Sequence, residues 1–233
     1  NLSEFAETSF KEMHARQYHL LLKWSERTKN KPIQIKAIRP IELPQKWAGV
    51  GMARKIGMDE AVRRFAEIGT DGLIINVDAD CTVDRRYLMR IADFMNSQNH
   101  CQALSLGFIH PLDAQKSKVE KMAIALYELH LRCYINWQKN YRYPYAFHTL
   151  GSCFAVRSSA YMEQGGMNRR KAGEDFYFLH KFSRNGSLMA LDEPLVYPSG
   201  RTSLRVPFGT GKAVHSILNT LNQKELYYSY NPE

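Results

Sequence analysis

The sequence of 233 residues predicts an α/β fold in which a mostly parallel sheet is flanked by helices. Segments with strand and helix patterns alternate along the chain, which is typical of this class. Residues 73–77 (LIINV) form an apolar run without alternation, as in a strand that is covered on both faces. The length suits one domain with a sizeable core, so we expect a single domain over residues 1–233.

The individual elements follow from the spacing of apolar residues. Helices are predicted over residues 1–30, 48–68, a segment that Asp84 caps, 115–139 and 175–185. Strands are predicted over residues 33–38, 73–77, 102–108, 151–157 and 187–192. Asn1 and Glu4 are placed to form a capping pair at the first helix. The buried stripe of helix 115–139 is expected to contain Val119, Met122, Leu126, Leu129, Cys133 and Trp137.

Charge and cysteine content narrow the function classes. The 32 Lys and Arg residues exceed the 23 acidic ones, but they are spread along the chain. Nucleic-acid binding favours a clustered basic stripe with interleaved aromatic residues, so we expect no nucleic-acid partner. The net charge of +9 fits either a solvated surface or attraction to a diphosphate, an anionic acceptor or a membrane face. Four widely spaced cysteines without a C-x-x-C pair favour a cytoplasmic protein.

The most informative local motif is Asp78-Ala79-Asp80, which directly follows the apolar run. In an open parallel sheet, ligands bind beyond the carboxyl ends of the strands. Two carboxylates at that place are costly unless they are solvated, capped or neutralised by a cation. Oxygen ligands suit Mg²⁺ or Mn²⁺, which also bridge to substrate phosphates. Asp78 and Asp80 are therefore candidate metal ligands, and the alternative is an ordinary acidic turn.

Four segments, in this order, resemble those of the family 2 glycosyltransferases, which have the GT-A (nucleotide-diphospho-sugar transferase) fold. They are GVGMARKIG (49–57), DGLIINVDADCTVDRRYL (71–88), GSCFAVRSSAYMEQGGM (151–167) and AGEDFYFLHKFSRNGSL (172–188). The resemblance runs from about residue 33 to 197, and Lys55 stands where the family usually has Asn. The tryptophan motif of processive polysaccharide synthases is not visible, which argues against a processive polymerase.

The resemblance implies an inverting transfer of a sugar from a UDP- or GDP-sugar to a hydroxyl of a glycan or lipid-linked acceptor. Asp80, assisted by Asp78, would hold Mn²⁺ or Mg²⁺ at the donor diphosphate. Asp175 would be the general base and Glu174 would orient the acceptor. Both acids could instead complement the N-terminus of their helix. Arg54 matches the first segment and is expected to contact the donor.

Further candidates depend on weaker signals. A third metal ligand could be His148, His180 or His215, and His215 is preferred because related enzymes place a ligand in that C-terminal segment. The glycine-rich segment 199–212 suits a loop that closes over the diphosphate, or an ordinary basic surface. Its candidate phosphate-binding residues are Arg201, Arg205 and Lys212. The aromatic residues Tyr141, Tyr143, Tyr145 and Phe147 could stack on a sugar or pack their loop against the core.

By the same resemblance, residues 1–72 correspond to a remnant of the nucleotide-binding half, 73–197 to the metal- and acceptor-binding core, and 198–233 to a C-terminal loop and helix. The family's opening strand-helix-strand is not recognisable. Two alternatives stay open: a haloacid-dehalogenase-type phosphatase with Asp78 as nucleophile and Asp80 as acid, or an inactive glycosyltransferase-like binding module. The expected location is the cytoplasm, including peripheral contact with the inner face of the membrane.

Overall fold

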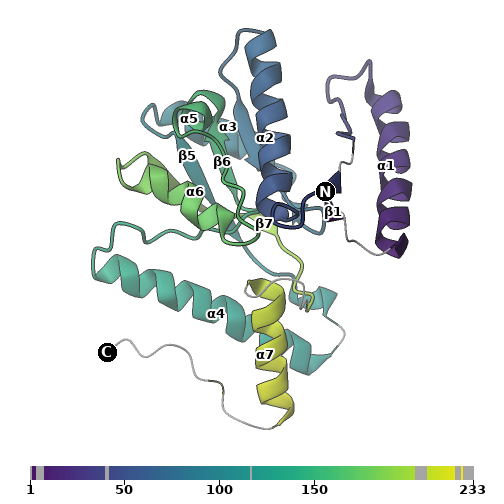
Figure 1. Cartoon of the computed structure of the whole chain (residues 1–233). Helices are drawn as coiled ribbons and strands as arrows, with labels where there is room; N and C mark the ends of the chain where they lie inside the picture. The colour runs from purple at the N-terminus through teal and green to yellow at the C-terminus, as the bar shows by residue number, and fades with distance from the viewer. Residues whose placement is uncertain are drawn as a thin grey trace.

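The computed structural model describes residues 2–3, 8–39, 42–115, 117–202, 209–223 and 227. Its helices are α1 (Thr8–Thr28), α2 (Val50–Glu67), α3 (Tyr87–Ser97), the 3₁₀ turn η1 (Leu112–Ala114), α4 (Lys118–Asn140), α5 (Ser158–Glu163), α6 (Glu174–Ser183) and α7 (Thr210–Asn222). Its strands are β1 (Leu2–Ser3), β2 (Glu42–Leu43), β3 (Leu73–Asn76), β4 (Thr82–Val83), β5 (Ala103–Phe108), β6 (Phe154–Arg157) and β7 (Leu188–Tyr197). The predicted α/β class is confirmed (Figure 1).

The main sheet is mixed, so the prediction of a mostly parallel sheet is not confirmed. Its five strands lie in the order β3-β6-β5-β7-β4, and within the described part of this sheet only β5 and β7 pair in parallel. The short strands β1 and β2 form a separate parallel pair. Strand β6 lies between β3 and β5 and runs against both. The apolar pattern indicates burial on both faces, but burial does not fix strand direction. Because β3, β5 and β7 still point the same way, their carboxyl ends meet at one edge of the sheet.

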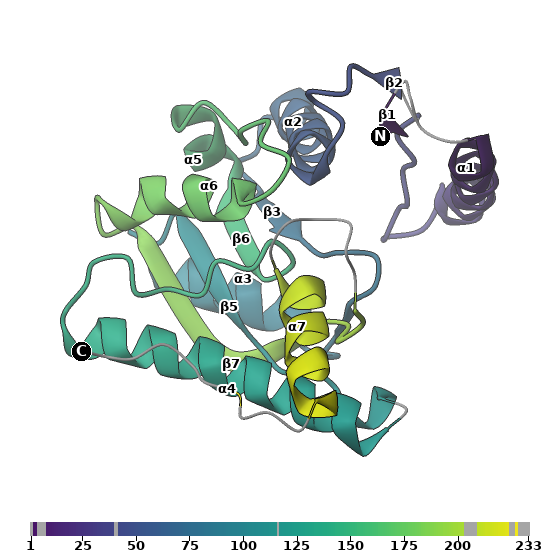
Figure 2. The same ribbon diagram turned by 60° about the horizontal axis from the view of Figure 1, so that its bottom comes forward.

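Helices cover both faces of this sheet. Along the strands, side chains alternate between the faces, as the period of two requires. Ile74, Phe154 and Val156 pack with residues of α2, α5 and α6 on one face. Ile75 and Ala155 pack with residues of α3 on the other face. The sheet is therefore the middle layer of an α/β/α arrangement, as Figure 2 shows from below.

Helices α4 and α7 pack against each other and form a separate apolar cluster. Its buried members are Ala123, Ile124, Tyr127, Val214 and Ile217. A capping box formed by Ser117 and Glu120 begins α4. The predicted stripe is wrong for three of its members, because Val119, Met122 and Leu129 are exposed. Three of the buried residues of α4, Ala123, Ile124 and Tyr127, instead belong to the cluster with α7.

The N-terminal region differs from the prediction in its packing. Residues 31–39 form no strand, and Ile33 is 73% exposed, so the strand predicted at 33–38 is wrong. The helix predicted over residues 1–30 is confirmed only for α1 (Thr8–Thr28), because Leu2–Ser3 form strand β1. None of the α1 residues is buried, and the helix stands apart from the main sheet in Figures 1 and 2. The Asn1–Glu4 pair lies outside the described residues. The cap residue of α3 is Arg86 rather than Asp84, whose Oδ1 accepts from the Arg86 N–H.

Candidate functional site

A cavity of about 670 Å³ lies beyond the carboxyl end of β3. It brings together six of the seven residues predicted to form the site: Arg54, Asp78, Asp80, Glu174, Asp175 and Arg201. They come from the N-terminal part of α2, the turn after β3, the start of α6 and the segment after β7. The seventh, His215, does not line the cavity. Acidic residues that are about 100 residues apart in the sequence thus share one site.

Arg54 connects the acidic pair Asp78 and Asp80 with the acidic pair Glu174 and Asp175. Its Nη2 donates to Oδ1 of Asp78 at 2.7 Å, and its Nη1 donates to Oε1 of Glu174. The arginine side chain is 10% exposed and that of Glu174 is 2% exposed, whereas that of Asp78 is 46% exposed. The guanidinium therefore compensates a buried carboxylate and holds a more open one. This contact fixes the end of β3 relative to the start of α6.

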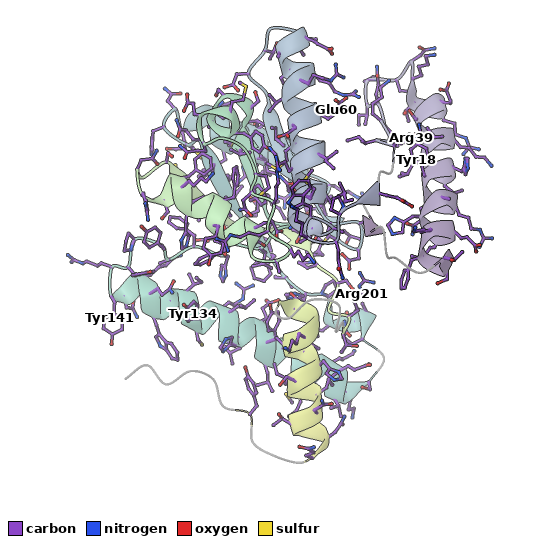
Figure 3. The ribbon with its side chains drawn as sticks, in the orientation of Figure 1. Tyr18, Arg39, Glu60, Tyr134, Tyr141 and Arg201 are labelled. Carbon is purple, nitrogen blue, oxygen red and sulfur yellow. The ribbon has the colours of Figure 1, made fainter. Side chains whose placement is uncertain are left out.

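A second ion pair lies on the open side of the site. Arg201 Nη2 donates to Asp80 Oδ2 at 2.7 Å, and the two side chains are 66% and 38% exposed. Figure 3 shows Arg201 on the segment that leads from β7 to α7. Exposed ion pairs contribute little to stability, so this contact can exchange for another cation or anion at low cost. Of the other two candidate phosphate-binding residues, Arg205 lies outside the described residues and Lys212 does not line the cavity.

The two acids at the start of α6 have different surroundings. Gly173, with φ of 70°, precedes the helix, and the Glu174 side chain turns inward to Arg54. Asp175 lines the cavity, and its Oδ1 accepts from the Phe176 N–H at 2.8 Å. Burial raises the pKa of Asp175 above its ordinary value, with a smaller contribution from Asp78, although Arg54 and the backbone act against it. A carboxylate with a raised pKa is a stronger proton acceptor.

Asp78 and Asp80 fit a hard divalent cation. Each carboxylate uses one oxygen in its arginine pair, at Oδ1 of Asp78 and Oδ2 of Asp80, and each has a second oxygen. Within the described part of the chain, no three His, Cys, Asp or Glu residues gather as a ready-made metal site. Two carboxylates suit Mg²⁺ or Mn²⁺, because these ions commonly complete their coordination with water and substrate phosphate.

The three histidines considered as a third ligand have other contacts. His215 on α7 lies next to Asn219, with 3.3 Å between its Nε2 and the amide nitrogen. Burial, with help from Arg132, lowers the pKa of His148 to about 4, and its ring packs against Phe108. His180 stacks on Tyr145. His148 and His180 line the cavity and His215 does not, so the preference for His215 gains no support from its position.

Sequence reasoning missed the role of Gly151. A Cβ at this position would lie 2.2–2.4 Å from three atoms of the Arg54 guanidinium. The absence of a side chain thus lets Arg54 reach both Asp78 and Glu174. The glycine opens one of the segments that suggested the family, but only the structure shows which side chain approaches it.

We expect Gly151→Ala to lower the free energy of unfolding by about 1–3 kcal/mol, because the added methyl group displaces Arg54 from its partners. The matched control is Gly57→Ala inside α2, where a Cβ meets nothing within 4 Å. That change should stabilise the protein by about 0.5–1 kcal/mol, since alanine favours helix. Urea unfolding curves measure both values. A stability gain in both variants would show that Arg54 moves aside without cost.

No protein-family model matches the chain, and no curated protein matches it. None of the helices that the structure describes is long and apolar enough to cross a membrane. All four cysteines are described and are free thiols. The chemistry of the cavity is therefore the basis for a functional proposal.

Proposed function

We propose that this chain is an inverting, metal-dependent glycosyltransferase of the GT-A type. The observation that carries the proposal is the pair of acidic motifs in one cavity, coupled by Arg54 and adjoining Arg201. The first motif offers oxygen ligands for a cation, and the second offers a carboxylate with a raised pKa. When a sugar moves from a diphosphate to a hydroxyl group, a cation can stabilise the leaving diphosphate and a carboxylate can remove the proton of the hydroxyl group. The resemblance of the four segments to family 2 glycosyltransferases supports the same reading.

Donor binding would involve Asp78, Asp80 and Arg201. The two aspartates would hold Mg²⁺ or Mn²⁺, which when bound supplies Lewis-acid stabilisation of negative charge on the leaving diphosphate. Arg201 already lies beside Asp80 and is exposed enough to turn to a phosphate oxygen. Arg54 has less freedom, because both of its terminal nitrogens are used by carboxylates. We therefore assign Arg54 to positioning Asp78 rather than to direct contact with the donor.

Transfer would use Asp175 as the general base. The acceptor oxygen attacks the anomeric carbon, its proton passes to a carboxylate oxygen of Asp175, and the bond from that carbon to the diphosphate breaks on the opposite face. The electron pair of the broken bond leaves with the diphosphate. Glu174 is buried against Arg54, so it acts through this arginine. That assignment replaces the expectation that Glu174 orients the acceptor.

The proposal includes a UDP- or GDP-sugar as donor and a glycan or lipid-linked acceptor. A cytoplasmic location and peripheral contact with the inner face of the membrane remain expectations from the sequence. Assignment of the mixed α/β/α sheet to the GT-A type depends on the order and spacing of the motifs. The phosphatase alternative requires Asp78 to act as a nucleophile, which the transferase proposal does not. A beryllofluoride adduct on Asp78 would therefore contradict the transferase proposal.

We expect Asp80→Asn to weaken Mn²⁺ binding at least about tenfold, because one charged oxygen ligand is replaced by a neutral one. Electron paramagnetic resonance of free Mn²⁺ measures this affinity, and calorimetry with UDP and Mn²⁺ measures donor-side binding. Asp84→Asn is the matched control, because Asp84 also forms an aspartate–arginine pair, with Arg86, but does not line the cavity. Equal Mn²⁺ affinity in Asp80→Asn and wild-type protein would remove Asp80 as a ligand.

A further inference from the structure

Three aromatic rings form a continuous surface on the cavity wall, which we call the aromatic platform. It consists of Tyr145, His180 and Phe176, all of which line the cavity. The rings of Tyr145 and His180 are stacked, with centroids 4.4 Å apart and planes 25° apart. The centroids of His180 and Phe176 are 3.8 Å apart. Two of these residues lie one helical turn apart on α6, and the third comes from the segment after α4.

The segment that carries Tyr145 is fixed against α6. Arg184 Nε donates to the Tyr145 hydroxyl at 3.1 Å, and Ser183 Oγ donates to the carbonyl oxygen of Pro144. Tyr143 packs edge-on against Tyr145, with centroids 5.4 Å apart. These contacts hold the Tyr145 ring in place before any ligand arrives. A preformed surface loses less conformational entropy on binding than a mobile one.

The platform is open at Phe176. This ring is 42% exposed, whereas Phe178 and Phe182 on the same helix are fully buried. The core under α6 is thus filled by other residues, and the Phe176 side chain remains on the cavity side. An apolar ring in a cavity that also contains charged groups is a common arrangement in binding sites for small molecules.

The platform suits an uncharged ligand. Burial, together with Arg184, lowers the pKa of His180, which favours the neutral form of its imidazole. A neutral imidazole gives no charge attraction to phosphate. The faces of aromatic rings carry partial negative charge and attract polarised C–H groups. A pyranose ring presents such C–H groups on one face and hydroxyl groups around its edge.

We propose that the aromatic platform is the subsite for a pyranose ring of the acceptor, and this inference rests on the proposed glycosyltransferase function. The Phe176 N–H donates to Oδ1 of Asp175, so the platform begins at the residue next to the general base. A sugar ring stacked on Phe176 brings its edge hydroxyls beside that carboxylate. The acceptor class is therefore a carbohydrate end rather than a simple lipid alcohol.

Saturation-transfer NMR with simple glycosides tests the subsite without metal or donor. The probes are methyl β-D-glucopyranoside, methyl β-D-galactopyranoside and methyl α-D-mannopyranoside. UMP is added in a second measurement to test whether a glycoside instead occupies the nucleotide-binding part of the cavity. At least one glycoside should receive saturation at its ring C–H protons. Phe176→Leu should reduce that signal at least about fivefold, whereas Phe176→Tyr should retain it. Leucine keeps an apolar side chain at this half-exposed position, so loss of folding is not expected.

Tyr141→Leu is the matched control, since Tyr141 belongs to the same aromatic segment but is 76% exposed and does not line the cavity. Figure 3 shows it at the end of α4. The glycoside signal should be unchanged in this variant. Three results would overturn the inference: no saturation of any glycoside, equal signals in Phe176→Leu and wild type, or loss of the signal on adding UMP. Because no metal is present, failure here is distinct from failure of Mn²⁺ binding at Asp80.

Discussion

Replacing Arg54 with alanine should lower the free energy of unfolding by about 3–5 kcal/mol, because it leaves a buried carboxylate without its partner. The Glu174 side chain is 2% exposed, and its carboxylate pairs with Arg54. Asp78, which is 46% exposed, can recover water and contributes less to the loss. Urea unfolding at pH 7, followed by circular dichroism, gives the value.

Arg63→Ala is the matched control for Arg54→Ala. Arg63 also lies on α2 and also pairs with two carboxylates, Glu60 and Glu67, but its side chain is 55% exposed. Its removal should leave the unfolding midpoint almost unchanged, because water replaces exposed ion pairs easily. The double variant Arg54→Met with Glu174→Met should recover much of the lost stability, since no buried charge remains. Equal losses from Arg54→Ala and Arg63→Ala would show that burial of Glu174 is not compensated by Arg54.

Local patterns predicted elements well and packing partners less well. Helix α2 and strand β3 lie within a few residues of their predicted ranges. Three of the six residues predicted for the buried stripe of α4 are exposed, because apolar residues occur on several sides of this helix. Ala123, Ile124 and Tyr127 on α4 are buried with Val214 and Ile217 of α7, which lie about 90 positions away in the sequence. Periodicity within one helix contains no information about that contact.

In the candidate site, too, local patterns indicated single residues but not their contacts with distant parts of the chain. Asp78, Asp80 and Asp175 could be selected from short motifs, since each motif combines a chemical group with a strand or helix end. The Arg54–Glu174 contact joins residues separated by 120 positions, and no local pattern indicates it. The stacking of Tyr145 on His180 likewise joins two segments whose proximity follows from the tertiary fold. The sequence thus predicted candidate residues for the cavity but not the contacts that join them.

Asp175→Asn should lower the transfer rate at least about a hundredfold, because asparagine keeps the shape of the side chain but cannot accept the acceptor proton. Release of UDP or GDP from nucleotide sugars, with the glycosides above as acceptors, measures the rate. Asp113→Asn is the control, because Asp113 is fully exposed and does not line the cavity. Its rate should equal that of wild-type protein. Normal turnover in Asp175→Asn would exclude Asp175 as the general base.

The transfer rate should fall as the pH is lowered. Burial raises the pKa of Asp175 in the folded protein, so the rate should fall on the acid side at a pH above the ordinary carboxyl value of 3.8. The rate falls there because protonation removes the base. A pH–rate profile measures the position of this acid limb. An acid limb at or below the ordinary value would place the catalytic proton on another group.

The stability that is linked to Asp175 should fall as the pH rises, whereas the transfer rate should rise. A raised folded-state pKa means that the stability linked to this carboxyl group is present below its unfolded pKa and lost as the pH rises through the folded pKa. At pH 7 the ionised Asp175 therefore disfavours folding, so Asp175→Asn should leave the melting temperature unchanged or raise it. Glu174→Gln should lower the melting temperature, because it removes the charge that pairs with Arg54 in a buried position. A catalytic carboxylate at Asp175 predicts a large rate loss in Asp175→Asn with an unchanged or higher melting temperature. A structural carboxylate at Glu174 predicts a lower melting temperature in Glu174→Gln without a rate loss of that size.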